Sequence, residues 1–147
     1  MLKNLDPILT PDLLWVLRAM GHGDDLVLSD ANFPAQSVAG AKHLIRLQGV
    51  DIPTAARAIL SVLPLDSFVP HPVLRMEVVG RADYLPPVQQ EMQREIDKAE
   101  GKSLPMGSIE RFAFYEAAKQ GFAVVTTSEM RGYGCFLLKK GVILAAD

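Results

Sequence analysis

Cysteine is almost absent from this sequence of 147 residues, because Cys135 is the only one. A single cysteine excludes an intrachain disulfide and a metal site built from several cysteines, and it fits a reducing compartment. No stretch approaches the ~20 apolar residues of a membrane span. Near the start of the chain, Lys3, Asp6 and Pro7 interrupt the apolar residues, so no signal-peptide core forms. We therefore expect a cytoplasmic protein without a membrane anchor.

Neither sign of charge is in excess, since 15 basic and 17 acidic side chains give a net charge of −2. The chain thus has no basic field for nucleic acid. Gly21-His22-Gly23 resembles the start of a dinucleotide fingerprint, but position 26 is Leu where the third glycine would stand. There is no Walker phosphate loop, no histidine pair at metal-ligand spacing and no serine nucleophile elbow. We expect no metal and no nicotinamide cofactor.

Apolar residues, by contrast, are abundant at 49% of the chain. This lies at the upper end of the usual ~45–50%. A well-filled core explains it, and so does a buried subunit interface; composition alone favours the core. No repeat or long linker divides the sequence, so we expect one domain over residues 1–147.

Helix and strand signals alternate along the chain. Thr10-Pro11-Asp12 supplies an N-cap, a first-turn proline and an acid, so a helix begins there, and Gly21 is the expected left-handed residue that ends it. A further helix over 111–120 is expected to be capped by Ser108 and Gly121. Other helices are predicted at 53–63 and 86–99, and strands at 25–29, 43–47, 73–79, 122–127 and 135–139. This order predicts a three-layer α/β/α domain whose largely parallel or mixed sheet is covered by helices on both faces.

Two loop residues are candidates for chemistry. His22 lies between two glycines just beyond a helix end, and an unperturbed histidine titrates near pH ~6.5, so it is the best general acid/base available. A loop histidine that caps carbonyls is the alternative. Asp30 directly follows a predicted strand, at the edge where ligands of α/β sheets bind. It can equally form an Asx turn that holds Asn32 and Phe33.

Two further candidates come late in the chain. Arg111 begins a predicted helix and can bind adjacent hydroxyls of a polar ligand, or it can pair with Glu110 or Glu116. Tyr133-Gly134-Cys135 combines a phenol with flexible backbone near a strand start, and a tight turn is the alternative. Cys135 has no neighbouring base in sequence, so we do not expect a nucleophile.

These residues lie in segments whose order and spacing together resemble the family of L-fucose mutarotases and D-ribose pyranases, the RbsD/FucU family. The segments cover nearly the whole chain: Met1-Leu2-Lys3, Ile8–Leu14, Met20–Asp24, Ser29-Asp30-Ala31, Phe33-Pro34-Ala35, Leu65-Asp66-Ser67, Arg111–Glu116, Tyr133-Gly134 and Leu137–Gly141. The chain is more similar to the fucose branch, which Arg111 favours.

The resemblance implies an enzyme that interconverts the α and β anomers of a free sugar without a cofactor. It implies that His22 is the catalytic acid/base and that Asp30, Arg111, Tyr133, Gly134 and position 135 bind the sugar. It also implies ring-shaped pentamers or decamers. Three positions depart from the fucose pattern: Asn32 and Gln36 stand where histidines are common, and Cys135 stands where asparagine is common. The contact at position 135 is therefore expected from the backbone, because a thiol hydrogen-bonds weakly.

Spacing adds a geometric expectation. If residues 25–29 form one extended strand, His22 and Asp30 lie at its opposite ends, about 16 Å apart at ~3.3 Å per residue. We therefore expect an active site at a subunit boundary, with His22 from one chain and sugar-binding groups from its neighbour. The rival class is a non-enzymatic monosaccharide-binding or transport-accessory protein, and a structural assembly protein is third. His22 separates the first two classes, since binding alone needs no titratable group there.

Overall fold

A computed structural model describes residues 1–146 of the chain. Six strands form one mixed sheet in the order β2-β5-β1-β6-β3-β4. β1, β2 and β5 run parallel to one another, β6 is antiparallel to its neighbours β1 and β3, and β4 is parallel to β3 at the edge. The strands are β1 (Asp25–Ser29), β2 (His43–Leu47), β3 (Val73–Met76), β4 (Gly107–Ile109), β5 (Ala123–Thr127) and β6 (Phe136–Lys139).

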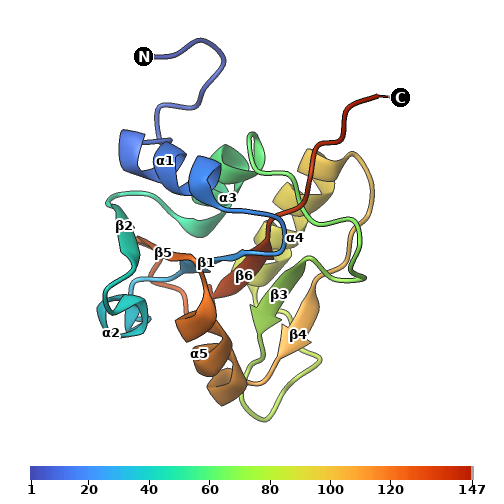
Figure 1. Cartoon of the computed structure of the whole chain (residues 1–147). Coiled ribbons are helices and arrows are strands. Elements are labelled where there is room, and N and C mark those ends of the chain that lie inside the picture. The colour runs from blue at the N-terminus through green and yellow to red at the C-terminus, as the bar shows by residue number, and fades with distance from the viewer. Residues whose placement is uncertain (147) are drawn as a thin grey trace.

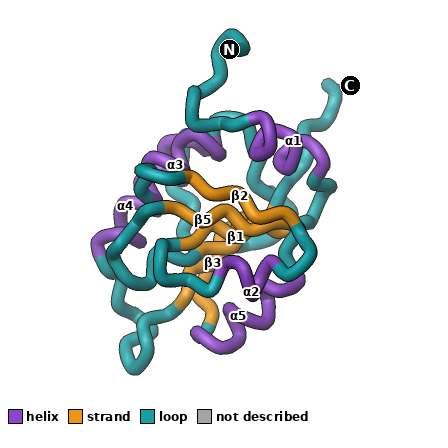
Figure 2. Tube along the Cα trace, turned by 90° about the vertical axis from the view of Figure 1, so that its left-hand side faces the viewer, coloured by secondary structure: helices purple, strands orange, loops and turns teal. Residues whose placement is uncertain are grey.

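Helices cover both faces of this sheet. The part of the chain that the structure describes has five helices: α1 (Pro11–Ala19), α2 (Ala35–Ala39), α3 (Ile52–Leu60), α4 (Pro87–Glu100) and α5 (Arg111–Gln120). α1, α3 and α4 lie on one side and α2 and α5 on the other (Figure 1), and Figure 2 shows the sheet between the two groups. None of the helices in residues 1–146 has the length and apolar character needed to cross a membrane.

The side chains of the strands follow this layering. Leu26 and Leu28 of β1 join the core cluster with α1, α3 and α4, whereas Val27 between them joins the cluster with α2 and α5. Successive strand residues point to opposite faces, so a nearly continuous apolar strand fills two cores. The predicted three-layer class with a mixed sheet is confirmed.

Two of the four predicted helix caps, Gly21 and Ser108, were wrong, whereas Thr10 does cap α1; one predicted strand is shorter than expected, and two short elements were missed. α1 ends at Met20 in extended conformation, and the left-handed glycine is Gly23 (φ +85°) rather than Gly21. Ser108 lies in β4, and the N-cap of α5 is Glu110, whose carboxylate accepts from two backbone N–H groups. Gly121 does end α5. The strand predicted at 73–79 ends at Met76, and α2 and β4 were not predicted, being only five and three residues long.

Candidate functional site

The candidate residues separate into two groups at opposite ends of β1. Because β6 runs antiparallel beside β1, with Leu28 opposite Phe136, the segment that precedes β6 lies at the end of β1 that is followed by Asp30. His22 precedes β1 and lies at the other end, where the Gly23 N–H donates to the carbonyl of Lys140. The predicted strand 25–29 is confirmed, and its five residues span roughly 16 Å.

One pocket of about 230 Å³ lies at the Asp30 end. It gathers side chains that the sequence places far apart, from the ends of β1 and β3, the start of α5 and the loop before β6. Its lining residues are Asp30, Asn32, Phe33, Met76, Arg111, Tyr115, Gly132, Tyr133 and Cys135. Four of the predicted site residues therefore share one pocket, and His22 is not among its lining residues.

The Asp30 side chain links the end of β1 to the segment before β6 beside this pocket. Its side chain is buried, and Oδ1 accepts from the backbone N–H groups of Asn32 (3.0 Å) and Phe33 (3.1 Å), so the Asx turn considered for it is present. Oδ2 accepts from the Gly134 N–H at 3.1 Å. A Cβ at position 134 would lie 3.3 Å from the Cβ of Asp30, so glycine permits this close approach. Asp30 thus lines the pocket and also fixes the backbone around it, in the turn after β1 and at Gly134.

Cys135 contacts the same carboxylate. Its Sγ lies 3.5 Å from Oδ2 of Asp30 in a buried position. Burial, followed by the negative charge of Asp30, raises the pKa of the thiol. The thiol therefore stays protonated and donates to Asp30, and a protonated thiol is a poor nucleophile.

Arg111 is not neutralised by the glutamates considered as its partners. Glu110 caps α5, and the carboxylate of Glu116 lies 2.7 Å from the ammonium of Lys119. The guanidinium of Arg111 instead contacts the hydroxyl of Tyr115, with Nε 3.4 Å from Oη. Its remaining donors are left for a ligand, which is what recognition of vicinal hydroxyls requires.

Tyr133 has an uncommon backbone conformation. Its φ of +64° lies in the left-handed region, which costs a non-glycine residue roughly 1–2 kcal/mol. Its hydroxyl accepts from the N–H of Val79 (3.4 Å), and its carbonyl accepts from Nε2 of Gln89 (2.9 Å). Tyr133 is therefore held at its hydroxyl and at its backbone carbonyl, and it lines the pocket.

At the other end of β1, His22 pairs with Asp66. The imidazole Nε2 lies 3.1 Å from Oδ1 of Asp66, and the ring packs 5.5 Å from that of Phe68. The His22 side chain is 46% exposed, whereas that of Asp66 is 4% exposed. The Phe68 N–H, followed by His22, lowers the pKa of Asp66, so its carboxylate is ionised at neutral pH. His22 thus bonds a carboxylate rather than the carbonyls considered as the alternative.

Asp66 had no predicted role. It belongs to the Leu65-Asp66-Ser67 segment that contributed to the family resemblance, but its contact with His22 spans 44 positions. Lys140 links the two segments, because it forms an isolated β-bridge with Leu65 and its carbonyl accepts from the Gly23 N–H. That long-range pairing leaves no local pattern in the sequence.

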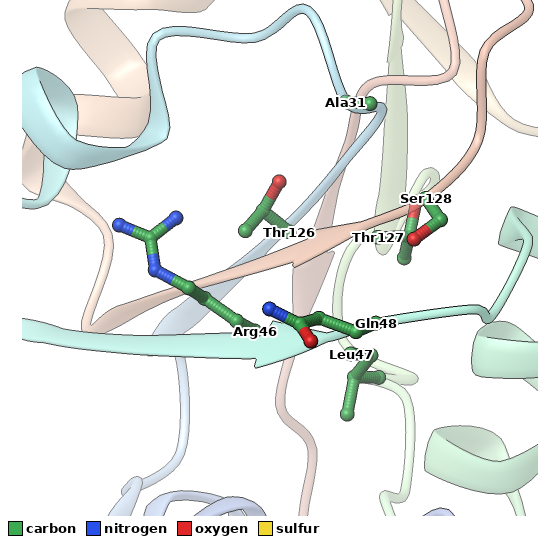
Figure 3. A pocket seen from close by; sticks show the side chains of 7 residues that line it. All are labelled: Ala31, Arg46, Leu47, Gln48, Thr126, Thr127 and Ser128. Carbon is green, nitrogen blue, oxygen red and sulfur yellow. The ribbon is translucent and has the colours of Figure 1, made fainter.

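A second hollow lies at the carboxyl ends of β2 and β5 (Figure 3). Arg46 and Thr126 reach into it from neighbouring strands. The guanidinium of Arg46 already donates to Oε1 of Gln36 at 2.9 Å. None of the predicted site residues lines this hollow, so it is not the candidate site.

The fold is that of an α/β protein, and the carboxylate, guanidinium and phenol groups that line its pocket suit a small polar ligand. The chain belongs to the RbsD / FucU transport protein family, whose model matches residues 3–143. It is 44% identical over 151 residues to the fucose mutarotase of Bos taurus, covering 99% of this chain and 97% of the relative. The resemblance inferred from the sequence is confirmed.

Two solved structures are similar over nearly their whole length. One is protein Atu2016, provisionally described as sugar binding, with a TM-score of 0.95, 59% identity and coverage of 98% of this chain and 97% of that one. The other is the fucose mutarotase of Streptococcus pneumoniae in complex with L-fucose, with a TM-score of 0.88, 38% identity and coverage of 97% and 100%.

Proposed function

We propose that this chain is a cytoplasmic mutarotase that interconverts the α and β anomers of a free monosaccharide, with L-fucose the first candidate. The observation that carries the proposal is the division of groups along β1: hydroxyl-binding side chains line one pocket, and a carboxylate-paired, half-exposed histidine stands apart from it. The Bos taurus and Streptococcus pneumoniae relatives, whose names give fucose mutarotase activity, support the reaction.

The reaction needs only proton transfers and positioning. A pyranose opens when its ring oxygen gains a proton and its anomeric hydroxyl loses one; the aldehyde then rotates and the ring closes on its other face. His22 gives the proton to the ring oxygen, and the proton of the anomeric hydroxyl goes to Tyr133 or returns to His22 through water. Arg111 and Tyr133 hold the hydroxyls. Asp66 stabilises the protonated imidazole and fixes Nε2, which leaves Nδ1 for the sugar. General acid/base catalysis contributes typically ~10²–10⁴-fold, which suits a reaction that already proceeds unaided.

We infer that the site is completed between subunits of a homo-oligomeric ring, a pentamer or decamer. His22 of one subunit then reaches the pocket of its neighbour, since the pocket within its own chain lies at the far end of β1. Phe68 beside His22 and Phe112 beside Arg111 are each 68% exposed, which suits surfaces that meet a partner. The high apolar content of the chain is then partly due to subunit contacts.

The second candidate function is non-enzymatic monosaccharide binding, which the provisional description of protein Atu2016 favours. NMR magnetisation transfer between anomers of L-fucose, D-ribose, D-galactose and L-rhamnose separates the two. A mutarotase accelerates exchange of at least one sugar, and L-fucose is expected to respond most. Saturable binding with exchange at the spontaneous rate would support the binding protein instead.

A further inference from the structure

A fully buried amide stands behind the pocket. Gln89 of α4 is 0% exposed, and its Nε2 donates to the carbonyls of Met76 (2.8 Å) and Tyr133 (2.9 Å). Met76 ends β3 and Tyr133 precedes β6, and both line the pocket. One side chain of α4 therefore ties two walls of the pocket together from the core side.

The orientation of this amide is fixed by Arg75. Nη1 of Arg75 lies 3.3 Å from Oε1 of Gln89, and its Nη2 donates to the carbonyl of Ala82 at 2.7 Å. A guanidinium only donates hydrogen bonds, so it must face the amide oxygen. The amide nitrogen is left for the two carbonyls, and the reversed orientation would set donor against donor.

Tyr133 needs such support because it has a left-handed φ without being glycine. Strained backbone of this kind persists where the surroundings over-determine it. A second bond from α4 acts on the same loop, since Nη2 of Arg131 lies 2.8 Å from Oε2 of Glu91. Helix α4 therefore holds the loop before β6 at positions 131 and 133.

We propose that Gln89 is a positioning residue for sugar recognition: it holds the backbone of Tyr133 in the left-handed conformation that presents the phenol to the substrate. The identity of the sugar rests on the proposed function, but the effect of Gln89 on Tyr133 does not. The residue acts through Tyr133 and touches no substrate itself.

Gln89→Met keeps the side-chain length and removes all three hydrogen bonds of the amide: the two that it donates to Met76 and Tyr133 and the one that it accepts from Arg75. Gln93→Met is its matched control, because Gln93 lies one turn further along α4 and also bonds a carbonyl and an N–H of the backbone, those of Leu104 (2.8 Å) and Met106 (2.9 Å), away from the pocket. Gln89→Glu is the second variant: it keeps the shape and the Arg75 contact but replaces the donor by an acceptor.

Three tyrosines make the conformation directly observable, since 3-fluorotyrosine labelling gives one ¹⁹F signal each for Tyr84, Tyr115 and Tyr133. In Gln89→Met and Gln89→Glu we expect the Tyr133 signal to move or split while the other two stay, and the Kd for L-fucose to rise about tenfold. Gln93→Met should change neither. Unchanged Tyr133 signals in both Gln89 variants, or equal changes in Gln93→Met, would overturn the proposal. If the wild type binds L-fucose without accelerating exchange, mutarotase function fails while the tyrosine signals still decide the role of Gln89.

Discussion

Nε2 of His22 lies 3.1 Å from Oδ1 of Asp66, and this pair stands at the opposite end of β1 from Asp30 and the polar pocket. In the proposed mechanism, His22 is the general acid, and because it lies far from the pocket of its own chain it acts on a sugar held in a neighbour's pocket.

Replacing His22 by Ala should reduce catalysed exchange of L-fucose anomers to the spontaneous rate, a loss of roughly 10²–10⁴-fold, because the general acid is removed. Sugar binding should remain measurable by calorimetry, since the pocket is untouched. His71→Ala is the control: His71 is exposed and bonds the carbonyl of Pro105 at 3.0 Å. Normal exchange in His22→Ala would remove this residue from the mechanism.

Asp66→Asn should slow exchange about tenfold while leaving the Kd for sugar near the wild-type value. The amide can still accept from Phe68 N–H but no longer stabilises a protonated imidazole. Magnetisation-transfer exchange and calorimetry on the same variant separate the rate from the Kd. Exchange at the wild-type rate would mean that Asp66 only shapes the loop.

Arg111→Lys should raise the Kd for sugar roughly tenfold, about 1.4 kcal/mol, because an ammonium cannot reproduce the planar fork of donors. Arg46→Lys is the matched substitution in the second hollow and should leave the Kd unchanged. Isothermal titration of both variants decides which hollow holds the sugar. The reverse pattern would place it between β2 and β5.

Stability below neutral pH should depend on Glu129. The hydrogen bond from the Arg131 guanidinium lowers the pKa of Glu129 from 4.5 to about 2. Because the folded-state pKa lies below the unfolded value, the stabilisation is complete above about pH 5 and is lost as the pH falls toward 2. It amounts to at most about 3 kcal/mol and less after screening, since Arg131 is 42% exposed. Urea unfolding at pH 7 and pH 3 should show a larger loss for the wild type than for Glu129→Gln; equal losses would contradict the assignment.

The sequence was sufficient where signals are local. The alternation of helices and apolar strands predicted the layers of the fold. Short local segments also identified four candidate site residues, His22, Asp30, Arg111 and Tyr133. The extent of strand 25–29 even predicted that His22 and Asp30 lie apart.

Long-range contacts left no such signal. Asp66 meets His22 across 44 positions, and Gln89 meets Tyr133 across the same separation. In the sequence, Gln89 is indistinguishable from the other polar residues of an amphipathic helix, and only the packing of the folded chain shows that it is buried. Residues 107–109 pair with β3, so α5 begins later and is capped by Glu110 instead of Ser108. The composition of these three residues does not indicate that pairing.

The claim that the site is shared between subunits has a direct test, because His22→Ala and Arg111→Ala damage different halves of it. Each variant alone should lack catalysed exchange. Subunits mixed at equal amounts, dissociated and reassembled, should recover about one quarter of wild-type exchange, since that fraction of random neighbours pairs an intact His22 with an intact pocket. Native mass spectrometry would verify mixed assembly. Mixed oligomers without recovered exchange, or a fully active monomer, would contradict a shared site.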